Sequence, residues 1–170
     1  MMISQKMADA INEQIKNEFY SGWLYLAMAY KAEELSLKYF AEWFRMQEAE
    51  ERMHATKMCT YLIDQGADVK LSALDAPKFD GSSIATMVKE TVKHEKFITD
   101  CISNLVNIAR EDKDNATFNF LQWYVEEQVE EVASVTELED LVTLAGPNQL
   151  LLLEDRVKNI IAQRAAEPSA

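Results

Sequence analysis

A carboxylate and an imidazole occupy a helical stripe that should otherwise be apolar. Glu51 and His54 are three residues apart, so they lie on one face of an α-helix. Phe44, Met58 and Tyr61 continue the same spacing, which predicts that this face is buried. Burying an unpartnered carboxylate costs on the order of several kcal/mol. We therefore expect the rest of the chain to supply a compensating charge.

The same kind of misplaced residue recurs in an internal repeat. Glu18 precedes Glu51 by 33 positions, and Glu95 precedes Gln128 by the same interval. In each half, the second residue begins a polar pair three residues apart. At a rise of about 1.5 Å per residue, the inward residues of each helical hairpin lie level, about 25 Å from the turn. We expect six side chains to meet in the middle of a bundle: Glu18, Glu51, His54, Glu95, Gln128 and Glu131.

An all-α fold is expected to position these residues. Glycine and proline interrupt helices, and the chain has only four glycines and three prolines. Ser4 and Ser36 are plausible N-caps, and Gly66 and Gly146 are plausible helix stops. We predict one domain over residues 1–164 and a flexible tail over 165–170. Helices are expected over about 4–34, 36–66, 83–111, 114–145 and 148–163.

One connection is longer than the others. The segment from Gly66 to Ser83 has 18 residues, whereas a short loop between neighbouring antiparallel helices needs only about two to eight. At about 3.3 Å per residue, this segment can cross the whole length of the bundle. We therefore favour two hairpins joined by one long crossover. The matching depths alone leave a simple up-and-down topology open.

Charge and composition narrow the class of partner. The formal net charge of −12 argues against nucleic acid and against an anionic membrane surface. No apolar run is long enough to span a bilayer. Met1 to Lys6 turn polar at once, unlike a secretory signal, and Cys59 and Cys101 suit a pair of buried free thiols in a reducing compartment. A cytoplasmic protein that handles cations is expected, although an acidic surface also serves solubility alone.

Four carboxylates and one imidazole in a helical core require a counter-charge. Neighbouring carboxylates cannot all ionise unaided, and neither Lys nor Arg lies on the inward stripes. Oxygen ligands with one nitrogen favour iron or manganese, with zinc as a competitor. Glu51 would bridge two metals about 3.5–4 Å apart. Glu18 and His54 would complete one metal, and Glu95 and Glu131 the other.

Other residues near the stripes allow two interpretations each. A single inward glutamate often pairs with Lys or Arg, and a single histidine is often a hydrogen-bonded core residue. Only the conjunction of six favours a metal centre. Glu50, Glu127 and Glu130 are neighbours of inward residues and form either a third, outer metal site beside Glu131 or solvated surface acids. Tyr25 either donates to the centre or is simply part of the core.

Several segments together resemble prokaryotic non-haem ferritins. They are Asn12-Glu13-Gln14 through Glu18, Tyr20 and Tyr25, the Glu51-x-x-His54 pair, and Phe118-Asn119-Phe120-Leu121-Gln122-Trp123-Tyr124-Val125 followed by Glu127-Gln128. The resemblance extends over about residues 1–163. It implies a ferritin-like four-helix bundle with a short fifth helix, assembled as a hollow homo-oligomeric cage of 24 subunits. It also implies a ferroxidase that oxidises Fe(II) with dioxygen or hydrogen peroxide and stores Fe(III) as a hydrated oxide mineral.

The same resemblance implies roles for individual residues. Glu18, Glu51 and His54 would hold the first iron, and Glu51, Glu95 and Glu131 the second. Gln128 would hydrogen-bond a metal-bound water or oxygen species, and Tyr25 matches a tyrosine near the first iron. The outer third iron would be held by Glu50, Glu127, Glu130 and Glu131.

The sequence also departs from related families. Haem is not expected, because Arg52 follows Glu51 where bacterioferritins have a haem-ligating methionine, and because Gln128 and Glu131 replace their second Glu-x-x-His pair. The chain has no cysteine-rich rubredoxin module of the rubrerythrin type.

Two alternatives to iron storage are a di-metal redox enzyme, such as an oxygenase or a manganese catalase-like protein, and a purely structural helical assembly.

Overall fold

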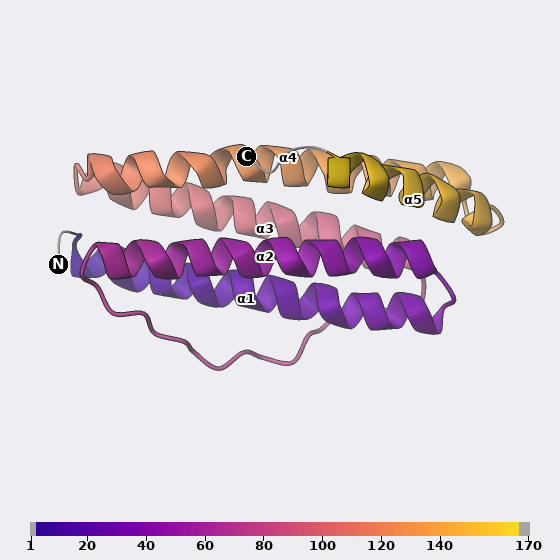
Figure 1. The fold of residues 1–170 in the computed structure, drawn as a ribbon, viewed down its shortest axis with the longest axis horizontal. Helices are drawn as coiled ribbons and strands as arrows, with labels where there is room; N and C mark the ends of the chain where they lie inside the picture. Colours follow the sequence, from indigo (N-terminus) through magenta and orange to yellow (C-terminus); the bar gives the residue numbers. More distant parts are fainter. Residues whose placement is uncertain (1–2, 167–170) are drawn as a thin grey trace.

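Helices make up the regular structure of this chain. The computed structural model describes residues 3–166, and within that range it has no strand. The helices are α1 Gln5–Glu34, α2 Lys38–Asp64, α3 Ile84–Glu111, α4 Asn115–Ala145 and α5 Leu150–Ala166. One hairpin is formed by α1 and α2 and another by α3 and α4, and α5 folds back onto α2 and α4 (Figure 1). The predicted four-helix bundle with a shorter fifth helix is confirmed.

The connection between the hairpins runs along the outside of the bundle. Residues 65–83 pass from one end to the other, so that α2 and α3 point in the same direction (Figure 1). Asn12 of α1 fixes this segment in two places. Its Nδ2 donates to the Asp68 carbonyl at 2.9 Å, and its Oδ1 accepts from the backbone N–H of Lys70 at 2.6 Å. The predicted long crossover is therefore present, and the up-and-down topology is excluded.

Most helix ends have local stop and start signals. Ser4, Ser83 and Asp114 each accept a hydrogen bond from the backbone N–H three residues later, which satisfies a donor of the first turn. Gly146 follows α4 with φ 62°, a left-handed conformation that glycine adopts without strain.

The start of α2 differs from the prediction. Ser36 has φ 62° and does not cap the helix, which begins two residues later with no side-chain cap from Leu37. Glu154 of α5 caps it instead. Its carboxylate accepts from the backbone N–H groups of Tyr39 and Phe40 at 2.9 and 3.0 Å. A cap from a residue 114 positions away leaves no local sequence signal.

The other predicted ends shift by a few residues. The helix α2 ends at Asp64, before Gly66, and α5 begins at Leu150 where Asn148 was predicted. Because α5 extends to Ala166, the first two residues of the predicted tail are helical. The rest of that tail, 167–170, lies outside the described residues.

Two further expectations concerned the burial of the cysteine thiols and the absence of a membrane-spanning helix. Cys59 and Cys101 are free and half-buried, whereas buried thiols were expected. Within residues 3–166, no helix combines the length and the apolar character that crossing a bilayer requires.

The apolar core divides into two clusters, one toward each end of the bundle. The first lies near the α1–α2 turn and includes Tyr25, Phe40, Phe44, Val135 and Leu138, with Leu153 and Val157 from α5. The second lies near the α3–α4 turn and includes Met7, Ile11, Met58, Leu62, Ile102 and Leu121. On every long helix, those of the six predicted inward polar residues that it carries fall between the two clusters. The free energy gained by burying both apolar clusters therefore offsets the cost of burying the polar layer between them.

Candidate metal centre

Polar side chains from all four long helices meet between the two apolar clusters. Each of the six predicted side chains is at most 5% exposed. They are Glu18 from α1, Glu51 and His54 from α2, Glu95 from α3, and Gln128 and Glu131 from α4. Their convergence agrees with the equal depths that the 33-residue repeat predicts. The function of the four glutamates and His54 as metal ligands stays a prediction, as does the role of Gln128 as a hydrogen-bond donor to a metal-bound species.

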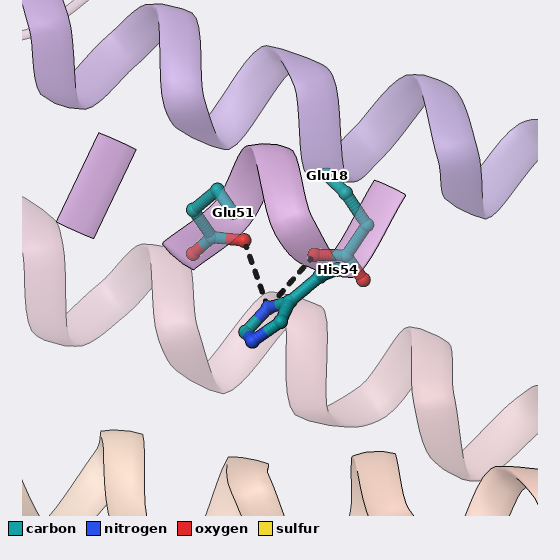
Figure 2. Close-up of side chains that lie close together, drawn as sticks. All are labelled: Glu18, Glu51 and His54. Atoms are coloured by element: carbon teal, nitrogen blue, oxygen red, sulfur yellow. Dashed lines mark ion pairs between the residues drawn. The ribbon is translucent and has the colours of Figure 1, made fainter. Parts of the chain in front are cut away.

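Glu18, Glu51 and His54 form the first group (Figure 2). Each offers one ligand atom, and these atoms lie within 4.8 Å of one another. The Nδ1 of His54 lies 3.5 Å from Glu51 Oε2 and 3.8 Å from Glu18 Oε2. On the other side of Glu18, Gln14 Nε2 donates to Oε1 at 2.8 Å and fixes the carboxylate. Two carboxylates and one imidazole therefore face a common point.

Glu51, Glu95 and Glu131 form the second group, with the same 4.8 Å limit on their ligand atoms. Tyr25 donates to Glu95 from the hydroxyl. Gln128 Nε2 donates to Glu131 Oε2 at 2.6 Å and lies 3.5 Å from Glu95 Oε2. Glu51 belongs to both groups.

Hydrogen bonding leaves much of this centre unsatisfied. Neither carboxylate oxygen of Glu51 has a hydrogen-bond partner, and Glu18 Oε2 and His54 Nε2 also lack one. Buried polar atoms are normally paired, and leaving one unpaired costs about 1–3 kcal/mol. These orphaned atoms are all lone-pair donors or potential lone-pair donors. Such a donor set fits cations.

Without bound cations, burial and mutual repulsion of the carboxylates favour the protonated form of some glutamates in the two groups. Burial, and then the charges of Glu131, Glu95 and Glu18, raises the pKa of Glu51 well above its usual range. Burial, followed by Glu95 and Glu18, raises the pKa of Glu131 in the same way. For Glu18 burial is again the largest influence and raises the pKa, but the neighbouring side chains of His54, Glu51 and Gln14 together outweigh it and lower the pKa. A cation entering the centre would therefore displace protons.

The chain's second histidine is close to the centre but outside both groups. His94 Nε2 lies 2.7 Å from Ser21 Oγ, and its ring meets Tyr25 edge-on at 6.2 Å between centroids. Burial lowers the pKa of His94 to about 4. At neutral pH this ring is uncharged and hydrogen-bonded, so His94 is a core residue.

The predicted outer acids are less tightly assembled. Among residues 3–166, only the two inner groups bring three ligand atoms within 4.8 Å of one another. Glu50 and Glu127 are half-buried, and the Glu130 side chain is 63% exposed. Glu127 Oε2 lies 3.9 Å from His54 Nε2, whereas Glu50 and Glu130 both face Arg164 of α5 at 3.8 Å.

Sequence reasoning missed three residues at this centre. Gln14 lies one turn before Glu18, and a second polar residue on that face was the available signal. Thr99 lies one turn after Glu95, and its Oγ1 donates to Gln128 Oε1 at 2.8 Å, which orients the amide nitrogen toward Glu131. The third is Arg164, whose position depends on how α5 folds back, and no local pattern predicts it.

Comparisons with known proteins agree with this arrangement. Residues 8–144 match the family model described as the Ferritin-like domain. The chain is 37% identical to a bacterial non-heme ferritin of Staphylococcus aureus over 156 residues, which cover 91% of this chain and 94% of the relative. It is 35% identical over 161 residues to a probable bacterial non-heme ferritin-like protein of Haemophilus influenzae, covering 94% and 98%. Among solved structures, an open pore ferritin of the archaeon Archaeoglobus fulgidus superposes with a TM-score of 0.89 at 42% identity, covering 92% and 96% of the two chains.

Proposed function

The chain belongs to the ferritin family, and on this premise we propose that it stores iron after oxidising Fe(II) at the two groups described above. The proposal rests mainly on the environment of the Glu51 carboxylate. It is fully buried, has no hydrogen-bond partner on either oxygen, and belongs to both groups. A side chain in this state is suited to bridge two cations, one on each side.

Each protein group has a definite task in this reaction. Fe(II) is the substrate, and Glu18, Glu51 and His54 would bind one ion while Glu51, Glu95 and Glu131 bind the second. Each Fe(II) gives up one electron, so the pair supplies the two electrons that convert dioxygen to hydrogen peroxide, or peroxide to water. Protons displaced from Glu51 and Glu131 on binding would become available to the reduced oxidant. Gln128, held by Thr99, would donate a hydrogen bond beside the second ion.

Storage requires that the oxidised product stay with the protein. We propose a hollow cage of 24 subunits that encloses a ferric oxide-hydroxide mineral. Support comes from family membership and from large apolar side chains that one subunit leaves uncovered. Leu144 at the end of α4 and Leu151 and Leu152 at the start of α5 are exposed. Contacts between subunits would bury these leucines and remove an aggregation hazard.

A di-metal enzyme acting on an apolar substrate is the second candidate. One observation favours it. A groove of about 670 Å³ between α3 and α4 exposes mainly apolar surface and reaches Thr99 and Gln128. An oxygenase would need such an access route, whereas an iron store would not. The two functions differ in how much metal the protein keeps.

Iron loading separates the candidates. Excess Fe(II) is added in air, the mixture is passed through a sizing column, and iron per subunit is counted in the protein peak. Storage predicts a very large particle that carries far more than two irons per subunit. A discrete enzyme would retain about two, and a structural assembly none. Glu51→Ala and His54→Ala should slow rapid Fe(II) oxidation without altering particle size, and wild-type oxidation rates in both variants would rule out the assigned centre.

A further inference from the structure

A cationic side chain from α5 lies among the outer acids. Arg164 Nη1 is 3.8 Å from Glu50 Oε2 of α2, and Arg164 Nη2 is 3.8 Å from Glu130 Oε1 of α4. The guanidinium therefore bridges carboxylates from two helices that belong to different hairpins. These distances are ion-pair distances, longer than direct hydrogen bonds, so the contacts are electrostatic and leave the carboxylate lone pairs free.

Arg164 is held in this position by more than charge. Its Nη1 donates to Gln47 Oε1 at 2.7 Å, and Gln47 is buried on α2 one turn before Glu51. The Arg164 side chain is only 17% exposed. Because α5 is anchored at its other end by Glu154, the last turn of α5 is directed onto the outer acids. The guanidinium of Arg164 is therefore held at a fixed position next to the outer acids.

A buried atom without a hydrogen-bond partner lies next to one of the outer acids. His54 Nε2 has no hydrogen-bond partner, although the side chain is 2% exposed. It points toward Glu127 Oε2 and Glu131 Oε1, each at 3.9 Å. Glu50 Oε2 likewise lacks a hydrogen-bond partner. Two unpaired polar atoms of α2, His54 Nε2 and Glu50 Oε2, therefore lie near the outer acids, whose carboxylate oxygens are ligands that suit a divalent cation.

We propose that Arg164 is a built-in counter-cation of the outer acids, which a divalent cation must displace in order to bind there. This inference rests on the proposed function, since it concerns a cation on its way to or from the inner groups. Both the guanidinium and the cation are attracted to Glu50 and Glu130, and they repel each other. Cation binding and docking of the last turn of α5 are therefore mutually exclusive, and each weakens the other by the same factor.

The test uses Zn(II), which is not oxidised, on the full-length assembled protein. Zn(II) binding is followed by calorimetry for the wild type, Arg164→Gln and Lys158→Gln. Arg164→Gln removes the positive charge beside the outer acids. Lys158→Gln is the control, because it removes a positive charge from the same helix at a site where the side chain lies over Tyr39, 5.5 Å from the ring centroid. We expect Arg164→Gln to tighten the weakest Zn(II) step at least fivefold, within the usual range for coupled sites. Lys158→Gln should match the wild type.

A second substitution tests whether the weakest Zn(II) binding step takes place at the outer acids. Glu130→Gln should abolish the weakest step both alone and combined with Arg164→Gln. If Arg164→Gln superimposes on the wild type, the proposal is wrong. It is equally wrong if Arg164→Gln weakens the step, because Arg164 would then support the acids and not compete for them.

The reciprocal effect provides an independent readout. Amide hydrogen exchange over residues 160–166 should become faster when wild-type protein is saturated with Zn(II), because the last turn of α5 is released. Glu130→Gln should not show this change, and unchanged exchange in the wild type would overturn the proposal. Neither readout depends on Fe(II) oxidation. A protein that binds Zn(II) as expected but never oxidises Fe(II) would refute the proposed function alone.

Discussion

The carboxylate of Glu154 in α5 accepts the backbone N–H of Phe40 in the first turn of α2 at 3.0 Å. The same carboxylate accepts from Tyr39 at 2.9 Å, so one buried glutamate satisfies two donors that helix geometry leaves free. A negative charge at a helix N-terminus is also favoured by the helix dipole. This contact ties the fifth helix to the hairpin that contributes Glu51 and His54.

Removing that contact should destabilise the chain. We expect Glu154→Ala to lower the free energy of unfolding by about 1–2 kcal/mol, the usual effect of losing an N-cap. Asp155→Ala, at an exposed position on the same helix, is the matched control and should have little effect. Chemical denaturation of both variants measures the difference. Equal stability of Glu154→Ala and Asp155→Ala would show that the contact contributes nothing.

This cap also shows where sequence analysis of the fold is limited. The caps at Ser4, Ser83 and Asp114 could be predicted because the capping residue lies three positions from its donor. The bundle and its long crossover could be predicted from helical periodicity and loop length. The cap of α2 could not, because Glu154 is distant in sequence and reaches Phe40 only after α5 has folded back.

The metal-free centre should lose stability as pH rises. The pKa of Glu51 is raised, so the folded chain keeps its proton while the unfolded chain releases it above about 4.5. Protonation therefore contributes stability that is fully present below 4.5 and declines as the pH rises toward the folded pKa. Glu51→Gln removes the ionisable group. In the presence of a chelator it should be more stable than wild type by about 1–4 kcal/mol at pH 8, with the difference shrinking toward pH 4.5.

The control for this titration is Glu42→Gln, which alters an exposed glutamate of the same helix. Thermal melts across the pH range should show no widening gap between this variant and wild type. A Glu51→Gln protein that is less stable at pH 8, or a gap that does not vary with pH, would contradict the assignment of a strained, proton-holding Glu51.

Tyr25 should tune the second group through Glu95. Burial raises the pKa of Glu95, and the hydrogen bond from Tyr25 partly offsets that rise. In Tyr25→Phe the pKa of Glu95 rises further, so Zn(II) binding at this group should require a higher pH than in the wild type. Calorimetry from pH 5 to 8 measures the shift, with Tyr30→Phe as the exposed control. An unshifted profile would leave Tyr25 as packing alone.

The exposed leucines of α5 should be needed for assembly. Leu151 and Leu152 are 86% and 71% exposed in one subunit. Replacing both with Glu should shift the particle to smaller species in light-scattering chromatography, because buried charges are costly at an apolar contact. Helix content should not change. Asn159→Glu adds charge to another exposed position of α5 and should assemble normally. A double variant with wild-type mass would place the subunit contacts elsewhere.

The positions of the six inward side chains could be predicted because they depend on few quantities. Helix rise and a 33-residue repeat place Glu18 level with Glu51 and Glu95 level with Gln128. The hydrogen bonds that orient them could not be predicted in the same way. Gln14 and Thr99 act through rotamers chosen by neighbouring helices, and Arg164 reaches the outer acids from the last helix.

The most direct test of the central claim is anomalous diffraction from crystals soaked with Fe(II) without oxygen. The account predicts two iron peaks on either side of Glu51, one contacted by Glu18 and His54 and the other by Glu95 and Glu131. An iron-free centre, or a single iron that does not touch Glu51, would contradict it.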